Sequence, residues 1–320
     1  MATMTHDTSA RTAGLGFAVL SAASFGLSGP LGRGLMDAGW SSAAAVAARI
    51  LLAAVVLVPV AIVQLRGRWG VLRRNLALVT VYGLIAVAGC QLAYFNAVER
   101  MPVGVALLIE YTAPVAVVGW LWVRHGQRPG RRTVVGAVLG GLGLVLVLDL
   151  VSGAHADVVG ILWAFGAMVG VATYFVLSGR VDDGLPPVVL AAAGLLLGGV
   201  ALLLAGAVGI VGLTVTTAPV QFVGMTVVWW VPVLALGIFT AAVAYVTGIA
   251  ATRRLGSRLA SFVALIEVLA ALVFAWALLG EVPKAIQLLG GVLVLAGVIV
   301  VKLGEPVAAA TPRNDLVPVP

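Results

Sequence analysis

The stretch GVALLIEYTAPV, residues 104–115, holds one glutamate, Glu110, inside an otherwise apolar run, with Pro114 four residues further on. A similar stretch, SFVALIEVLAAL, returns at residues 261–272, where Glu267 takes the place of Glu110. An ionisable side chain in the middle of an apolar, membrane-length helix costs free energy and indicates a functional site. Two such residues at matching places in two halves of one chain are typical of secondary transporters built from inverted repeats.

The composition of the chain predicts a membrane protein. It has 320 residues, of which 62% are hydrophobic and 10% charged, and its mean hydropathy is +1.16. Soluble domains are roughly 25% charged, and apolar runs long enough to span a bilayer fill nearly the whole sequence. The net charge of +7 comes mostly from basic residues in short loops, so we expect no nucleic-acid partner. The single cysteine, Cys90, excludes an internal disulfide.

The apolar runs predict an all-α, polytopic membrane protein with ten transmembrane helices. Their expected ranges are 13–35, 42–64, 75–98, 102–123, 132–149, 157–178, 187–211, 229–250, 259–279 and 284–302. We expect a first repeat of five spans over 13–149, a second over 157–302, and disordered tails at 1–12 and 303–320. Because each repeat has an odd number of spans, the second enters the membrane upside down.

The lysine and arginine residues predict the orientation. They gather at the N-terminus, in the C-terminal tail and in the loops after the even-numbered spans, whereas the opposite loops hold only Arg33, Arg100 and Lys284. Both termini are therefore expected in the cytoplasm. The abundance of arginine, alanine, valine and glycine hints at a bacterial genome, so we expect a multi-pass protein of the bacterial inner membrane.

Two opposite charges are expected at one depth in the membrane. Arg49 in the second span and Glu110 in the fourth each lie about two helical turns from the outer end, roughly 10 Å deep. A buried ion pair is the natural interpretation, because a lone charge there costs at least a few kcal/mol. The pair is either a structural clamp between two helices or an ion pair that opens to bind a charged substrate.

Glu267 has no such partner, because the seventh span, 187–211, contains no arginine or lysine. Burial without a cationic partner favours the neutral carboxyl group. Glu267 is therefore expected to be often protonated and to carry a proton. The alternative is a structural glutamate that is protonated or bonded to water.

Polar side chains on other spans are candidates to line a central cavity. Ser21, Ser24 and Ser28 share one face of the first span, just before Pro30, which kinks or ends that helix. Small hydroxyl residues also serve plain helix packing in membranes, and each residue alone is more typical of packing than of binding. The candidate substrate- or ion-binding residues are Arg49, Glu110, Glu267, Gln91, Tyr94, Tyr245, Ser24 and Trp163.

The fifth and tenth spans carry glycines and no mid-membrane charge. These glycines are Gly136, Gly140, Gly143, Gly290, Gly291 and Gly297. Small residues let membrane helices approach closely. We interpret both spans as peripheral packing helices and as a candidate contact surface for a homodimer.

Several function classes lack their motifs. The sequence has no glycine-rich phosphate loop of the ATPase type, and its histidines lie in a tail or in loops without metal-ligand spacing. No Ser/His/Asp set shares a membrane depth, which argues against an intramembrane hydrolase. We therefore expect no enzymatic activity, no cofactor and no metal.

Three segments resemble the drug/metabolite transporter superfamily, specifically its EamA-type ten-span members. They are AYFNAVERMPVGVALLIEYTAP at 93–114, RRLGSRLASFVALIE at 253–267 and FAWALLGEVPKAIQLLGGVLVLAGVIVV at 274–301, and Arg49 accompanies them. The resemblance covers 14–302 as two EamA units and implies a secondary transporter of small solutes, often an exporter of amino acids or related metabolites. PVGVALLIEYTAP is similar to the threonine/homoserine exporter branch. Many members have Glu-Pro in the ninth span; Val268 follows Glu267 here, so we expect a straighter helix.

The expected function is export of a small polar metabolite, such as an amino acid or a related compound, by alternating access of the two repeats in a lipid bilayer. Proton exchange through Glu267 is the expected coupling. One alternative is an uncoupled facilitator of the same fold. Another is a non-transporting membrane protein, such as a lipid-head-group enzyme or an assembly partner, although no cluster of catalytic residues is visible at one interface.

Overall fold

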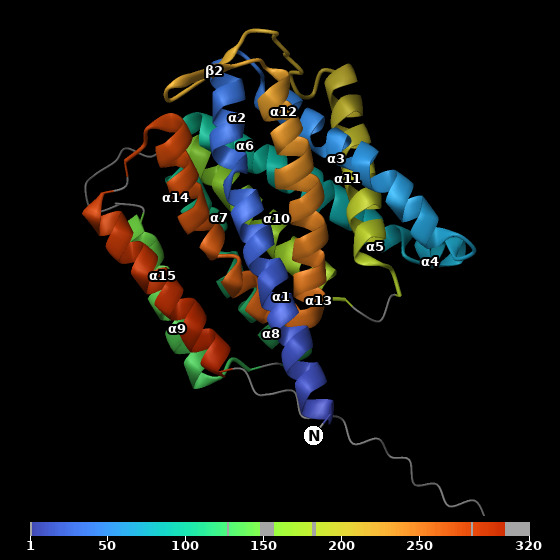
Figure 1. Ribbon diagram of the computed structural model, residues 1–320, viewed down its shortest axis with the longest axis vertical. Helices are drawn as coiled ribbons and strands as arrows, with labels where there is room; N and C mark the ends of the chain where they lie inside the picture. Colours follow the sequence, from blue (N-terminus) through green and yellow to red (C-terminus); the bar gives the residue numbers. More distant parts are fainter. Residues whose placement is uncertain (1, 127, 148–156, 181–183, 283, 305–320) are drawn as a thin grey trace, which may run out of the picture.

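The computed structural model describes residues 2–126, 128–147, 157–180, 184–282 and 284–304. In these ranges the chain is helical almost throughout (Figure 1). Six helical segments are long and apolar enough to cross a membrane, and two shorter apolar helices follow at Ile266–Leu279 and Leu288–Val301. The six segments are Thr12–Asp37, Ser42–Leu65, Leu76–Arg100, Val158–Ser178, Pro187–Ala207 and Trp230–Val263. The chain is therefore a multi-pass membrane protein.

The first half of the described chain forms nine α-helices and a π-helical segment, η1. They are α1 (Ala2–Gly26), α2 (Ser28–Asp37), α3 (Ser42–Leu65), α4 (Trp69–Arg74), α5 (Leu76–Val81), η1 (Tyr82–Gly89), α6 (Cys90–Arg100), α7 (Val103–Glu110), α8 (Ala113–His125) and α9 (Arg131–Val147). Helix α1 begins at Ala2, inside the stretch expected as a tail.

The second half adds six α-helices, a second π-helical segment and a small sheet. They are α10 (Val158–Ser178), α11 (Pro187–Ala207), β1 (Val220–Phe222), β2 (Met225–Val227), α12 (Trp230–Gly237), η3 (Ile238–Val243), α13 (Ala244–Val263), α14 (Ile266–Leu279) and α15 (Ala285–Gly304). The antiparallel hairpin of β1 and β2 is a departure from the expected all-α class. It lies in the uncharged stretch between α11 and α12, which is rich in valine, threonine and glycine.

A proline interrupts the first membrane segment, as the sequence predicts. Pro30 has no N–H to donate to the carbonyl of Gly26, so the helical hydrogen-bond ladder fails there. Helix α1 ends at Gly26 and α2 begins at Ser28. The interruption leaves Ser28 fully inside the protein, with no hydrogen-bond partner for its hydroxyl oxygen among the described residues.

Helices α9 and α15 form a pair at one side of the molecule (Figure 1). Their glycines make the close approach possible: a Cβ on Gly136 would lie 2.7 Å from the carbonyl oxygen of Gly297, and a Cβ on Gly297 would lie 2.8 Å from the backbone nitrogen of Gly140. The prediction of peripheral helices packed through small residues is therefore confirmed for this pair. The close contact within the chain uses Gly136, Gly140 and Gly297. The homodimer stays a prediction.

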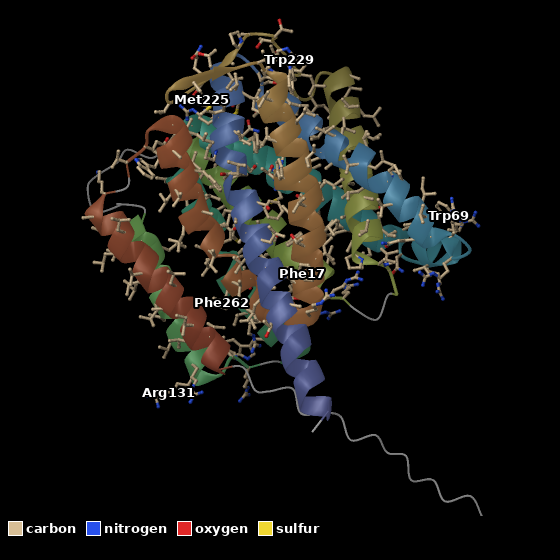
Figure 2. All side chains as sticks on the ribbon, viewed as in Figure 1. Phe17, Trp69, Arg131, Met225, Trp229 and Phe262 are labelled. Atoms are coloured by element: carbon tan, nitrogen blue, oxygen red, sulfur yellow. The ribbon has the colours of Figure 1, made fainter. Side chains whose placement is uncertain are left out.

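Three loops that the charge pattern places on one side of the membrane meet at one end of the molecule. The indole N–H of Trp40 donates to the carbonyl of Thr216 at 2.9 Å, and the N–H of Val223 donates to the carbonyl of Leu278 at 2.9 Å. Met225 and Trp229 lie at this end, and Arg131 lies at the opposite end (Figure 2). The hairpin and the segment that precedes it thus cover the ends of α2, α3 and α14.

Both glutamate-bearing segments are broken next to the glutamate. Helix α7 ends at Glu110, whose carbonyl has no donor four residues on because Pro114 lacks an N–H. Helix α13 ends at Val263, and short-range hydrogen bonds, such as Glu267 N–H to the Ala264 carbonyl at 2.8 Å, tighten the turn before α14. A straighter helix was expected here; the turn forms without proline. The two glutamates differ in position relative to the breaks. Glu110 is the last residue before the first break, whereas Val263 is the last residue before the second, and Glu267 lies four residues further on.

A second interruption lies within α13, at Gly256, between Arg254 and Arg258. Gly256 has φ 80° and ψ 154°, a conformation that residues with a side chain rarely adopt. The expected loop between the eighth and ninth spans is reduced to this one glycine. The helix therefore changes direction at Gly256 and approaches Glu267 as a separate segment.

Candidate functional site

A small cavity lies between the broken segments, with a volume of about 50 Å³. This space suffices for a few water molecules. Its walls come from α1, η1, α6, α7, α10, α13 and α14, so both halves of the chain contribute. Glu110 and Glu267 both line it, and none of the described lining residues is basic.

Glu110 is buried, with only 5% of its surface exposed, and is incompletely paired. Its Oε1 atom lies 3.8 Å from the Cys90 sulfur, and its Oε2 atom has no hydrogen-bond partner among the described residues. The same sulfur lies 3.5 Å from the Ala167 carbonyl. A thiol has one hydrogen, so it cannot donate to both oxygens at once. Glu110 is thus a carboxyl group held in place with capacity for a further ligand.

Glu267 is partly exposed and has one specific partner, Tyr111. The Tyr111 hydroxyl donates a hydrogen bond to Oε2 of Glu267. Tyr111 lies in the break between α7 and α8, directly after Glu110. One residue therefore connects the two glutamate-bearing breaks.

Arg49 is completely buried and does not face the cavity. Its guanidinium donates to Oε1 of Gln91 and to the Thr240 carbonyl. Its Cζ atom lies 5.7 Å from the ring centre of Phe25 and 6.0 Å from that of Phe95, distances typical of cation–π contacts. No ion pair among the described side chains joins Arg49 to Glu110. The ion pair suggested by their common depth is absent from this conformation, because the Gln91 amide takes its place.

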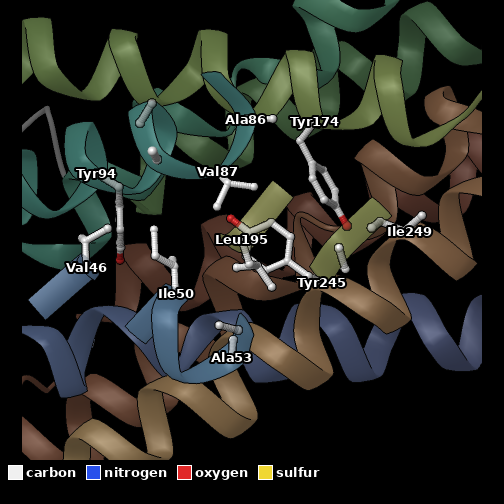
Figure 3. Packing of buried hydrophobic residues seen from close by; sticks show 14 of the residues in the cluster. Val46, Ile50, Ala53, Ala86, Val87, Tyr94, Tyr174, Leu195, Tyr245 and Ile249 are labelled. Atoms are coloured by element: carbon white, nitrogen blue, oxygen red, sulfur yellow. The ribbon is translucent and has the colours of Figure 1, made fainter. Parts of the chain in front are cut away.

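Aromatic rings close one wall of the cavity. Phe25 meets Tyr245 edge to face at 5.1 Å between ring centres, and Tyr174 meets Tyr245 in the same way at 5.8 Å. Figure 3 shows Tyr174 and Tyr245 within the packed core. The Tyr174 hydroxyl is buried without a hydrogen-bond partner in the described chain, and Ser21 donates to the Ala244 carbonyl at 2.8 Å.

The sequence-predicted residues separate into two groups. Glu110, Glu267, Gln91 and Tyr245 line the cavity. The others do not face it: Arg49 and Tyr94 are buried beside it, Ser24 lies on another part of α1, and Trp163 is 37% exposed in an apolar groove between α10 and η1. Trp163 lies on a face of α10 that does not line the cavity, and the sequence alone does not tell which way that helix faces.

The sequence interpretation missed Tyr111, Cys90 and Phe25 as members of the site. Tyr111 is adjacent to Glu110, so it had a sequence signal in its position beside an intramembrane carboxyl. Phe25 lies one turn after Ser21, so the helical spacing of the cavity-facing serine also indicated it. Cys90 has no sequence pattern that marks it as a site residue, and only the packing of α6 against α7 places it beside Glu110.

The membrane segments Leu76–Arg100 and Trp230–Val263 share an irregular feature next to the site. Each contains a π-helical stretch: η1 ends immediately before Cys90 and η3 ends two residues before Tyr245. Such stretches widen a helical turn and occur often at functional sites. Thr240, whose carbonyl accepts from Arg49, lies within η3.

Comparison with known proteins adds three findings. The family model of the EamA-like transporter family matches residues 12–149 and again residues 158–303. A protein of Archaeoglobus fulgidus described as an uncharacterized transporter is 29% identical over 228 residues, covering 71% of this chain and 76% of the relative. A solved crystal structure of a protein with 22% sequence identity superposes with a TM-score of 0.68, covering 92% of this chain and 97% of that one. At that identity the structural likeness concerns the fold alone.

Proposed function

Because the chain belongs to the EamA-like transporter family, we propose that it is a secondary transporter that exports a small polar metabolite by alternating access. The two family-matched segments are the proposed inverted repeats, and ten spans with cytoplasmic termini in a bacterial inner membrane are the proposed topology. The sequence resemblance favours an amino acid or a related compound as the solute. Proton exchange through Glu267 is the proposed coupling.

One observation carries this proposal: carboxyl groups from both matched segments, Glu110 and Glu267, line one cavity at a place where two membrane helices are broken. Broken helices at mid-membrane are where secondary transporters build their binding sites. The cavity of about 50 Å³ is too small for a metabolite, so the described conformation is a closed one. Its walls must separate for a solute to enter.

Tyr111 supports the coupling. Its hydroxyl holds Glu267, and the preceding residue in the chain is Glu110. A change in the protonation of either carboxyl alters the hydrogen bonds at a helix break, where the backbone has fewer internal bonds to resist movement. Protonation and helix movement are therefore linked at one point of the molecule.

The test uses the full-length protein in liposomes with a trapped pH-sensitive dye. Threonine, homoserine, other amino acids and their decarboxylated amines are added in turn, with and without an imposed proton gradient. The proposal expects solute-dependent proton movement that Glu267→Gln abolishes and that the control Glu281→Gln, at an exposed position outside the cavity, retains.

Two results would count against the proposal in different ways. Solute movement that follows only the solute gradient, and that Glu267→Gln leaves unchanged at every pH, would establish the uncoupled facilitator. No solute-dependent signal from any member of the panel, in protein that retains its melting temperature, would leave the non-transporting alternative.

A further inference from the structure

We propose that the central cavity binds an organic cation: a small amine with an apolar or aromatic portion and no carboxylate. This inference rests on the proposed transport function and names the substrate class of the same site. It narrows the choice between an amino acid and its related amines in favour of the amine.

The balance of charge around the cavity is the first argument. Glu110 and Glu267 face one small space, and the described lining contains no lysine, arginine or histidine. Arg49, beside the cavity, can balance one carboxylate at most. Two carboxylates on one small cavity, one of them buried and the other partly buried, are unfavourable with a single positive charge nearby, because the surrounding dielectric is low. The second carboxylate therefore needs a proton or a cationic ligand.

The surroundings of Arg49 are the second argument. An amino-acid substrate brings a carboxylate, which needs a cationic or N–H partner inside a membrane protein. Arg49 is the nearest cation, yet Phe25 and Phe95 lie against its guanidinium, and Gln91 and the Thr240 carbonyl each accept one of its five N–H groups. Its Nε atom, which has no partner in the described chain, is buried on the stem side. The cavity thus has few hydrogen-bond donors for a carboxylate, whereas its two glutamates can accept hydrogen bonds from an ammonium group.

The aromatic wall is the third argument. Phe25, Tyr174 and Tyr245 gather on one side of the cavity, in mutual edge-to-face contact. Aromatic faces attract ammonium groups and also accept hydrocarbon. Two buried polar atoms beside them have no partner within the described chain: Oε2 of Glu110 accepts a hydrogen bond, and the Tyr174 hydroxyl can donate or accept one. An amine with an apolar body satisfies both features.

The experiment compares compounds that share a body and differ in charge. Tyramine, tyrosine and 4-hydroxyphenylacetate share one ring and carry a cation, a zwitterion and an anion at neutral pH. Histamine with histidine and agmatine with arginine extend the comparison to other bodies. Each compound is added to liposomes that contain the wild-type protein, and proton movement and uptake of labelled compound are recorded.

We expect the amine of at least one series to be transported about tenfold better than its carboxylate-bearing partner, a ratio that one cation–π contact or one charge-assisted hydrogen bond can supply. Glu110→Gln and Glu267→Gln should each reduce amine transport by about tenfold or more on the same grounds. Glu110→Asp keeps the charge and should retain part of the amine transport. Phe25→Leu should weaken amine transport, whereas Phe239→Leu, at an exposed surface position, should not.

The outcomes are separable from those of the transport proposal. If the amino acids cause proton movement in every series and the amines cause none, the cation inference is overturned and the transport proposal stands. Silence of every compound in wild-type protein of normal melting temperature would overturn both. Because the comparison of amines with amino acids uses only the wild-type protein, misfolding of a glutamate variant does not change its outcome.

Discussion

The hydroxyl group of Tyr111 donates a hydrogen bond to the carboxyl group of Glu267, although the two residues are 156 positions apart in the chain. Tyr111 occupies the break between α7 and α8, and Glu267 lies in the first turn of α14, just after a second break. The bond therefore joins two places where the membrane helices lack part of their own backbone hydrogen bonds.

Removing this bond tests its role. In Tyr111→Phe the carboxylate of Glu267 loses its donor, and the ionised form loses more than the neutral form. We expect transport to survive, with its half-maximal activity displaced toward higher pH. The measurement is the pH profile of proton-coupled uptake in liposomes. Tyr82→Phe is the control, because Tyr82 is equally buried but does not line the cavity. An unmoved profile in Tyr111→Phe would show that the bond has no part in coupling.

The pairing of Arg49 with Gln91 leads to a prediction about stability. In Gln91→Ala the buried guanidinium loses one acceptor, which costs about 1–3 kcal/mol in the free energy of unfolding. We expect a lower melting temperature in detergent. Asn96→Ala is the matched control, because the Asn96 amide donates back to Leu92 within its own helix. Equal melting temperatures for the two variants would mean that water replaces the Gln91 amide at no cost.

The sequence predicts those parts of the fold that depend on hydropathy and helix-breaking residues. Apolar length marks the membrane segments, and Pro30 and Pro114 mark breaks because a missing N–H acts locally. The turn at Ala264 and Leu265 contains no proline, and η1 contains none either. These irregularities come from packing between distant helices, which local propensity does not encode.

The site follows the same division. The rarity of charge in an apolar helix identifies Arg49, Glu110 and Glu267, because any such residue must have a reason to be there. Equal depth suggested that Arg49 and Glu110 are partners, but depth fixes only one of three coordinates. The rotation of α6 decides that Gln91, rather than Glu110, reaches the guanidinium. Rotation is a property of tertiary packing.

The contact between α9 and α15 leads to a prediction about close packing. Gly136→Val and Gly297→Val place side-chain atoms where the partner backbone lies within 3 Å of the new Cβ. Such overpacking costs about 1–3 kcal/mol, so we expect a lower melting temperature. Gly141→Val on the same helix as Gly136 is the control, because nothing lies within 4 Å of a Cβ there. A full loss in the Gly141 variant as well would indicate a general cost of valine in α9 rather than a helix contact.

Asp157 leads to a prediction about pH. It caps the N-terminus of α10, and the backbone N–H of Val159, followed by the Arg100 guanidinium, lowers the pKa of its carboxyl group. A lowered pKa in the folded protein stabilises the fold above the unfolded value of about 4, and this stabilisation is lost as the pH falls through the folded value. Asp157→Ala should therefore lower the melting temperature at neutral pH and have less effect in acid. Asp157→Asn retains a capping oxygen and should lose less, with little pH dependence.

Cys90 provides an internal reporter of cavity opening, because it is the single cysteine of the chain and lies beside Glu110. In the described conformation Cys90 is buried against Gly170 of α10. The contact is so close that a Cβ on Gly170 would lie 2.9 Å from the Cys90 sulfur. A maleimide reagent can reach the thiol only when the helices around the cavity separate, so we expect slow alkylation of the resting protein in liposomes. Conditions that drive transport should accelerate it. The measurement is the mass of the intact protein over time, with unfolded protein as the reference for complete reaction and Cys90→Ala as the blank. Rapid alkylation at rest, equal to that of the unfolded chain, would show that the closed cavity is not the resting state.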